Sequence, residues 1–173
     1  MSQQMLNKNV ITKEVRVIIV EDYKLTRVGL RFALNEIENI NVIAEAQNAE
    51  IGLDLIRKEQ PDVVLMDLGL PGINGLEATA KVKNISPNTK IIICEPFRVD
   101  DRACFMKDYA IEARKIAEEF NLPFVALQEK LEQAVEVYGR HACFHDGLHP
   151  NIVGSKIISN EWLKVFKKEI EKE

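Results

Sequence analysis

Three acidic residues follow two strand-like runs of the sequence, one rich in β-branched residues and the other apolar throughout. Glu21 and Asp22 come directly after the run Val15–Val20, and Asp67 follows the run Val63–Met66. If the two runs are neighbouring parallel strands, the three carboxylates converge at the carboxyl edge of one sheet. Crowded like charges are unfavourable unless a cation or a proton intervenes, and hard oxygen ligands suit Mg²⁺. An exposed carboxylate beside bound Mg²⁺ can attack a phosphoryl group. The alternative is a set of ordinary solvated acids at loop ends.

A second pair of residues with chemical potential precedes the last apolar stripe of the chain. Asp146 lies three residues before His149. An acid in this position can orient the imidazole as a general base, as in a Ser-His-Asp triad. The spacing alone is a weak signal, and the alternative is a surface turn in which Asn151 caps the following helix.

Elements that position these residues can be predicted from short apolar runs that alternate with amphipathic stretches. Strict alternation of this kind predicts an α/β fold with a parallel sheet and right-handed crossovers. The expected strands are the runs Val15–Val20, Val42–Ala46, Val63–Met66, Ile91–Cys94 and Phe124–Leu127.

Helices are expected between these strands and at the carboxyl end of the chain. The first helix has apolar residues at helical spacing, which predict a buried stripe of Leu25, Val28, Phe32 and Ile37. Asn48 and Asn74 are the predicted N-caps of the next two helices. The last helix carries a stripe of Ile158, Trp162, Val165 and Phe166, and residues 95–106 are predicted to form a loop.

Residues from about Val15 to Ile93 resemble the receiver domain of bacterial two-component response regulators. The acidic pair Glu21-Asp22 and the segment Asp67–Gly75, with the sequence DLGLPGING, carry this resemblance. By resemblance, Asp67 is the phosphoacceptor, and Glu21, Asp22, Asp67 and the Gly69 carbonyl bind Mg²⁺. The expected phosphodonor is a histidine kinase or a small phosphorylated molecule.

This resemblance ends before the features that transmit a phosphorylation signal. A receiver places Ser or Thr at the end of its fourth strand, where this chain has Glu95. It places Lys at the end of its fifth strand, where Leu127-Gln128 stands here. No segment resembles a DNA-binding output domain.

Residues 92–168 resemble the C-terminal half of SGNH (GDSL-type) esterases and lipases. The supporting segments include Leu122–Gln128 and Asp146–Pro150. By resemblance, Asp146 and His149 are the acid and base of a catalytic triad. Tyr23 occupies the place of the family's Ser nucleophile, and the oxyanion-hole Asn is absent, so we expect an inactive hydrolase remnant.

Both resembled families share a flavodoxin-like fold, which implies a three-layer αβα sandwich with a five-stranded parallel sheet in the order 2-1-3-4-5. We therefore interpret the chain as an engineered chimera forming one hybrid domain. Residues 14–93 would be its receiver-like segment, 92–173 its hydrolase-like segment and 1–13 a flexible tail. The alternative is a natural, degenerate relative.

Composition limits the partners of the chain. Its 173 residues carry 23 basic and 27 acidic side chains, for a net charge of −4. Nucleic-acid binding requires clustered Lys and Arg, and no apolar run is long enough to span a bilayer. We therefore expect a cytoplasmic protein that binds neither nucleic acid nor membranes.

Overall fold

Five parallel strands form a single sheet in the computed structural model, which describes residues 13–94, 111, 113–115, 117–145 and 150–170. The strand order is β2-β1-β3-β4-β5, and every neighbouring pair is parallel. The predicted α/β class, strand order and flavodoxin-like architecture are therefore confirmed. The strands are β1 (Val15–Val20), β2 (Ile40–Ala46), β3 (Val63–Asp67), β4 (Lys90–Cys94) and β5 (Phe124–Val125).

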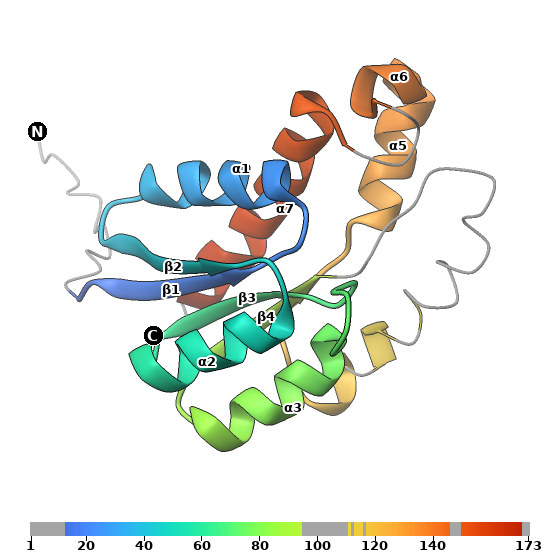
Figure 1. The fold of residues 1–173 in the computed structure, drawn as a ribbon. Helices are drawn as coiled ribbons and strands as arrows, with labels where there is room; N and C mark the ends of the chain where they lie inside the picture. The colour runs from blue at the N-terminus through green and yellow to red at the C-terminus, as the bar shows by residue number, and fades with distance from the viewer. Residues whose placement is uncertain (1–12, 95–110, 112, 116, 146–149, 171–173) are drawn as a thin grey trace, which may run out of the picture.

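Helices cover both faces of this sheet (Figure 1). The longest, α7, packs beside α1 on one face, whereas α2 and α3 lie on the other. The helices with defined bounds are α1 (Lys24–Asn35), α2 (Ala49–Glu59), α3 (Gly75–Ile85), α5 (Gln128–Tyr138), α6 (Arg140–Cys143) and α7 (Ile152–Ile170); residues 111, 113–115 and 117–119 are helical as well.

Alternate residues of each central strand enter two separate apolar cores. Val17 and Ile19 of β1 face α1 and α7, whereas Ile18 and Val20 face α2 and α3. Both faces of the strand are thus buried from Val17 to Val20, which explains the unbroken β-branched run of these four residues. Within the described residues no helix has both the length and the apolar character needed to cross a membrane.

Predicted helix starts agree with the structure. The Asn48 side chain accepts the Ile51 N–H at 2.9 Å, and the Asn74 side chain accepts the Glu77 N–H at 2.9 Å. Asn151 likewise accepts the backbone N–H groups of Val153 and Gly154 at the start of α7. These bonds satisfy amide donors that have no partner within a helix.

The predicted buried stripe of α1 is wrong in part. The helix ends at Asn35 and buries Thr26, Leu30 and Leu34, while Phe32 stays 70% exposed. Packing against α7 gives the physical reason: a Cβ added at Gly29 would lie 3.1 Å from the Ser159 hydroxyl oxygen. The face of α1 that carries Gly29 and Leu30 is therefore turned inward, and the face carrying Phe32 is left to solvent.

Candidate metal centre

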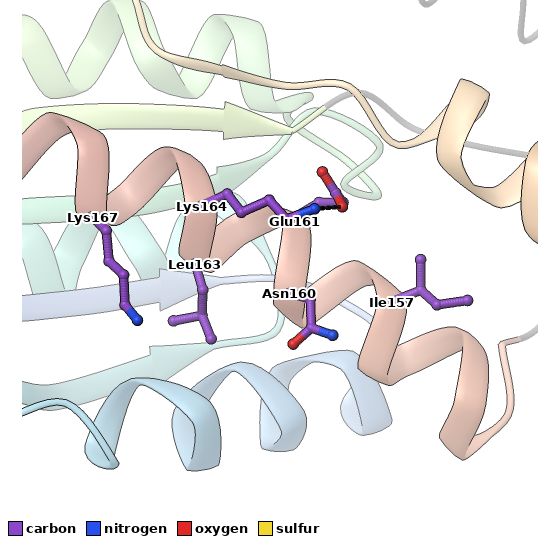
Figure 2. A pocket seen from close by; sticks show the side chains of 6 residues that line it. All are labelled: Ile157, Asn160, Glu161, Leu163, Lys164 and Lys167. Carbon is purple, nitrogen blue, oxygen red and sulfur yellow. Dashed lines mark hydrogen bonds and ion pairs between the residues drawn. The ribbon is translucent and has the colours of Figure 1, made fainter.

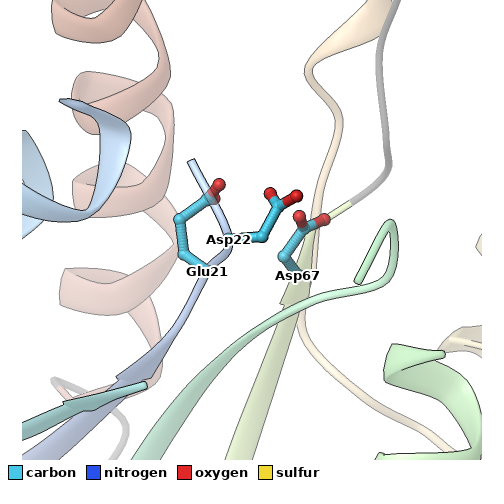
Figure 3. A group of neighbouring side chains, drawn as sticks. All are labelled: Glu21, Asp22 and Asp67. Atoms are coloured by element: carbon cyan, nitrogen blue, oxygen red, sulfur yellow. The ribbon is translucent and has the colours of Figure 1, made fainter. Parts of the chain in front are cut away.

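Neighbouring strands bring the three predicted acidic residues together. Asp67 is the last residue of β3, which pairs with β1 through Met66 and Val20. Glu21 and Asp22 follow Val20 directly, so all three side chains lie at the same end of the sheet. Figure 3 shows them pointing toward a common space, and one ligand oxygen from each lies within 4.8 Å of the others.

Burial and mutual repulsion perturb two of these carboxyl groups. Burial, followed by the negative charge of Asp22, raises the pKa of Asp67 to about 6. Burial also raises the pKa of Glu21 well above its ordinary value, and the charges of Asp67 and Asp22 act in the same direction. A proton or a cation that neutralises part of this negative charge would therefore stabilise the site.

Backbone amides hold two of the carboxylates in place. Glu21 accepts the Tyr23 N–H at 3.0 Å, and Asp67 accepts the Gly69 N–H at 2.9 Å. Asp22 is the exposed member of the group. Gly69, whose carbonyl is the fourth predicted ligand, is thus linked to Asp67 through its N–H group.

Arg27 is a further residue of the site that sequence analysis did not identify. Its guanidinium donates to the backbone carbonyls of Glu21 and Asp22 and pairs with Glu45 on β2. The nearby positive charge also works against the raised pKa of Glu21. No motif signals this role, because an Arg in the first turns of an amphipathic helix is usually a solvated charge.

The donor set fits Mg²⁺. Three carboxylates supply hard oxygen ligands, and the exposure of Asp22 leaves room for the water molecules that Mg²⁺ retains. In the described part of the chain, these are the acidic, His or Cys side chains whose ligand atoms lie close enough together to hold a metal ion.

The second predicted pair, Asp146 and His149, lies outside the described residues, as does Glu95. Pro150, the residue after His149, is described and buried. Its carbonyl accepts the Tyr23 hydroxyl at 3.2 Å, and Phe144 forms an antiparallel bridge with it. The chain on the C-terminal side of His149 is therefore anchored next to Tyr23, the residue that follows Glu21 and Asp22.

By resemblance, Leu127 and Gln128 were expected at the place of the receiver's Lys, at the end of the fifth strand, but β5 already ends at Val125 and Gln128 is the first residue of α5. The side chain is buried, and its amide nitrogen donates to Glu132 one turn further along α5 at 2.9 Å. The Gln128 amide is thus held by its own helix.

A pocket of about 360 Å³ lies elsewhere, along α7 (Figure 2). It is lined by Ile157, Asn160, Glu161, Leu163, Lys164 and Lys167. Glu161 and Lys164 form an ion pair there, and the pocket contains none of the three acidic residues.

Comparison with known proteins identifies the class that this sheet and acidic site define. The family model of the response regulator receiver domain matches residues 17–112, which is more than half of the chain. The chain belongs to this family.

Two curated relatives illustrate the match. The response regulator GacA of Pseudomonas viridiflava is 40% identical over 84 residues, which cover 47% of this chain and 39% of that protein. The response regulator UvrY of Escherichia coli K12 is 42% identical over 79 residues, covering 46% and 36%. The match thus spans about two fifths of the length of these relatives.

Solved structures show a likeness of fold over a longer stretch. A GDSL-like lipase from Parabacteroides merdae superposes with a TM-score of 0.65 and 19% identity over 88% of this chain and 95% of its own. An acetylxylan esterase from Geobacillus stearothermophilus gives a TM-score of 0.65 with 18% identity. Over 88% of its length, the chain therefore shares its fold with these two proteins.

Proposed function

We propose that the chain is a receiver module in which Asp67 accepts a phosphoryl group at a Mg²⁺ site formed by Glu21, Asp22, Asp67 and the Gly69 carbonyl. The observation that carries this proposal is the convergence of three carboxylates within 4.8 Å at the ends of β1 and β3. Membership of the receiver family supports the same roles.

Asp67 has the ionisation state that a nucleophile needs. With a pKa of about 6, its carboxyl group is mostly ionised at neutral pH. One carboxylate oxygen attacks the phosphorus atom, the bond between phosphorus and the donor's leaving group breaks, and an aspartyl phosphate forms. Bound Mg²⁺ supplies charge neutralisation for the oxygens of the transferring group.

The phosphodonor is a phosphohistidine of a kinase or a small acyl phosphate. We expect the product to form slowly and without a large rearrangement, because the Lys that pairs with the phosphoryl group in receivers is replaced. Leu127 and Gln128, which we match to this position by resemblance, carry no charge, and the Gln128 amide is bonded to Glu132.

A single hybrid domain is part of the proposal, with residues 14–93 and 92–173 as its two segments. Each apolar core supports this, because each contains residues from both segments. Our interpretation of the chain as engineered rests on the join falling near β4, inside the sheet, whereas fused domains normally join at exposed linkers.

Beryllofluoride, a mimic of the phosphoryl group, tests phosphoryl acceptance. We expect Mg²⁺ and beryllofluoride together to shift the amide NMR signals of Leu68 and Gly69 in the unmodified protein. Asp67→Asn should abolish these shifts. Asp54→Asn, a change of the same type at an exposed position on α2, should preserve them. Unshifted signals at saturating ligand in the folded, unmodified protein would falsify the proposal.

A further inference from the structure

Arg27 joins three elements around the acidic site. One guanidinium nitrogen, Nη1, donates to the carbonyl oxygen of Glu21 and lies 3.2 Å from that of Asp22. A second guanidinium nitrogen, Nε, lies 3.5 Å from a carboxylate oxygen of Glu45 on β2. The Arg27 side chain is only 13% exposed, so these contacts are formed in a partly desolvated environment in which they are stronger than at the surface.

The backbone that receives these bonds carries two of the three acidic side chains. Glu21 N–H donates to the Ala46 carbonyl of β2 at 3.0 Å, which ties one side of the residue to the sheet. Arg27 ties the carbonyl side of the same residue, and the carbonyl of the next residue, to α1. The direction in which the Glu21 and Asp22 side chains leave the backbone is therefore fixed from two elements.

We propose that Arg27 is a positioning residue of the acidic site, which holds Glu21 and Asp22 in the arrangement that a divalent cation requires. This inference rests on the proposed function. Arg27 contacts no cation itself; it acts through the two carbonyls. A residue that orients metal ligands in this way typically changes metal affinity by about 10- to 100-fold when it is removed.

A purely structural role is the competing explanation. In that case Arg27 would only fasten α1 to β2, and its removal would lower stability while leaving the affinity of the folded protein unchanged. A purely electrostatic role is a second alternative, in which any positive charge at this position would suffice.

Arg31 provides a matched control within the same helix. It pairs with the same Glu45 carboxylate at 3.0 Å but is 51% exposed, and in the described part of the chain it forms no hydrogen bond with Glu21 or Asp22. Removing Arg31 therefore removes a guanidinium from Glu45 without releasing the backbone of the acidic residues.

Mn²⁺ binding to the full chain, measured by electron paramagnetic resonance, tests the inference. Circular dichroism verifies that each variant is folded at the temperature used. We expect Arg27→Ala to weaken Mn²⁺ binding about tenfold or more and Arg31→Ala to change it by less than about twofold. Equal affinities of the unmodified protein and a folded Arg27→Ala variant would overturn the inference and leave the proposed function intact.

The variant Arg27→Lys distinguishes a positioning role of Arg27 from a purely electrostatic one. It also replaces Arg27→Ala in the experiment if that variant does not fold. Lys keeps the positive charge but cannot reproduce the fork of an Arg side chain, so we expect Mn²⁺ binding to remain clearly weaker than in the unmodified protein. Full recovery of affinity by Lys would overturn the positioning role. Absence of Mn²⁺ binding in the unmodified protein would end the proposed function, and this inference with it.

Discussion

The ionised side chains of Asp67 and Glu21 destabilise the folded protein when no cation is present. Each has a pKa above its ordinary value, chiefly because burial removes water from the carboxylate, and neighbouring negative charges add to the effect. The folded protein therefore binds protons more tightly at these groups than the unfolded chain does. Such a linkage makes stability fall as pH rises through the interval between the unfolded and the folded pKa.

Asp67→Asn is expected to stabilise the protein at neutral pH in the absence of divalent cations. The interval for Asp67 runs from its ordinary pKa of 3.8 to about 6, so the penalty is absent below it and complete above it. Asn removes the charge and can still accept the Gly69 N–H. Because the side chain is partly exposed, we expect a gain of about 1 to 2 kcal/mol at pH 7.5 and no gain at pH 4.

Urea unfolding at a series of pH values, with a chelator present, measures this effect. Asp54→Asn on the exposed face of α2 is the control and should leave the pH profile unchanged. If the difference between Asp67→Asn and the unmodified protein were the same at pH 4 and pH 7.5, the carboxyl group would not be perturbed as the structure indicates.

At the residue scale, the convergence of the three acidic residues was predictable from the sequence, whereas the contacts by which Arg27 holds them were not. Glu21, Asp22 and Asp67 follow strand-like runs, and parallel strands bring their carboxyl ends to one edge whatever the details of packing. The contacts of Arg27 depend on the direction in which α1 leaves β1 and on the position of β2. Neither of these is encoded in local spacing.

At the element scale, the position of Asp67 depends on the turn between β3 and α3. In this turn the backbone of Gly75, at the start of α3, closely approaches the backbone of Asp67 and Leu68 at the end of β3. A Cβ added at Gly75 would lie 2.0 Å from the Asp67 carbonyl oxygen and 2.6 Å from the Leu68 Cα. Gly75 N–H also donates to the Leu68 carbonyl at 3.3 Å. Because backbone atoms cannot rotate away as a side chain can, the first residue of α3 has to be Gly.

Gly75→Ala is therefore expected to destabilise the protein by about 2 to 3 kcal/mol and to displace Asp67. Gly29→Ala on α1 is the comparison, because the added methyl group would meet only the rotatable Ser159 hydroxyl at 3.1 Å. Thermal unfolding of both variants checks the difference in stability. A Gly75→Ala protein as stable as the Gly29→Ala protein would contradict the close approach.

Element boundaries were easier to predict than element faces. The caps at Asn48 and Asn74 are local interactions, and the sequence motif alone was sufficient to locate them. The inward face of α1 depends on α7, which lies more than 100 residues further along the chain. Periodicity shows that α1 has an apolar side, but only the position of α7 decides that Leu30 is buried and Phe32 is not.

At the scale of the whole molecule, the N-terminal and C-terminal parts of the chain share their cores. One core contains Val17 and Leu30, which precede β4, together with Val125, Trp162 and Phe166, which follow it. The other combines β1, β3, α2 and α3 with Ala113 and Ala117. Because each core is built from both parts of the chain, we expect the protein to unfold as one cooperative unit.

The overall strand order was predictable because both resembled families share it, and because βα alternation leaves few other topologies. The contact between Tyr23 and Pro150 was not predictable in the same way. The Tyr23 hydroxyl donates to the Pro150 carbonyl, and no local pattern links two residues so far apart in the sequence.

Leu30→Ala is expected to shift the unfolding of both segments together. Leu30 is buried in α1, and its truncation should cost about 2 to 5 kcal/mol. Trp162, the only Trp of the chain, reports on α7 by fluorescence, whereas far-UV circular dichroism reports on all helices.

We expect the two urea transitions to coincide in the unmodified protein and to move equally in Leu30→Ala. Phe32→Ala, at an exposed position on the same helix, should move them by less than about 0.5 kcal/mol. A Trp162 transition that stayed in place while the circular dichroism transition moved would mean that the segments unfold as two independent domains.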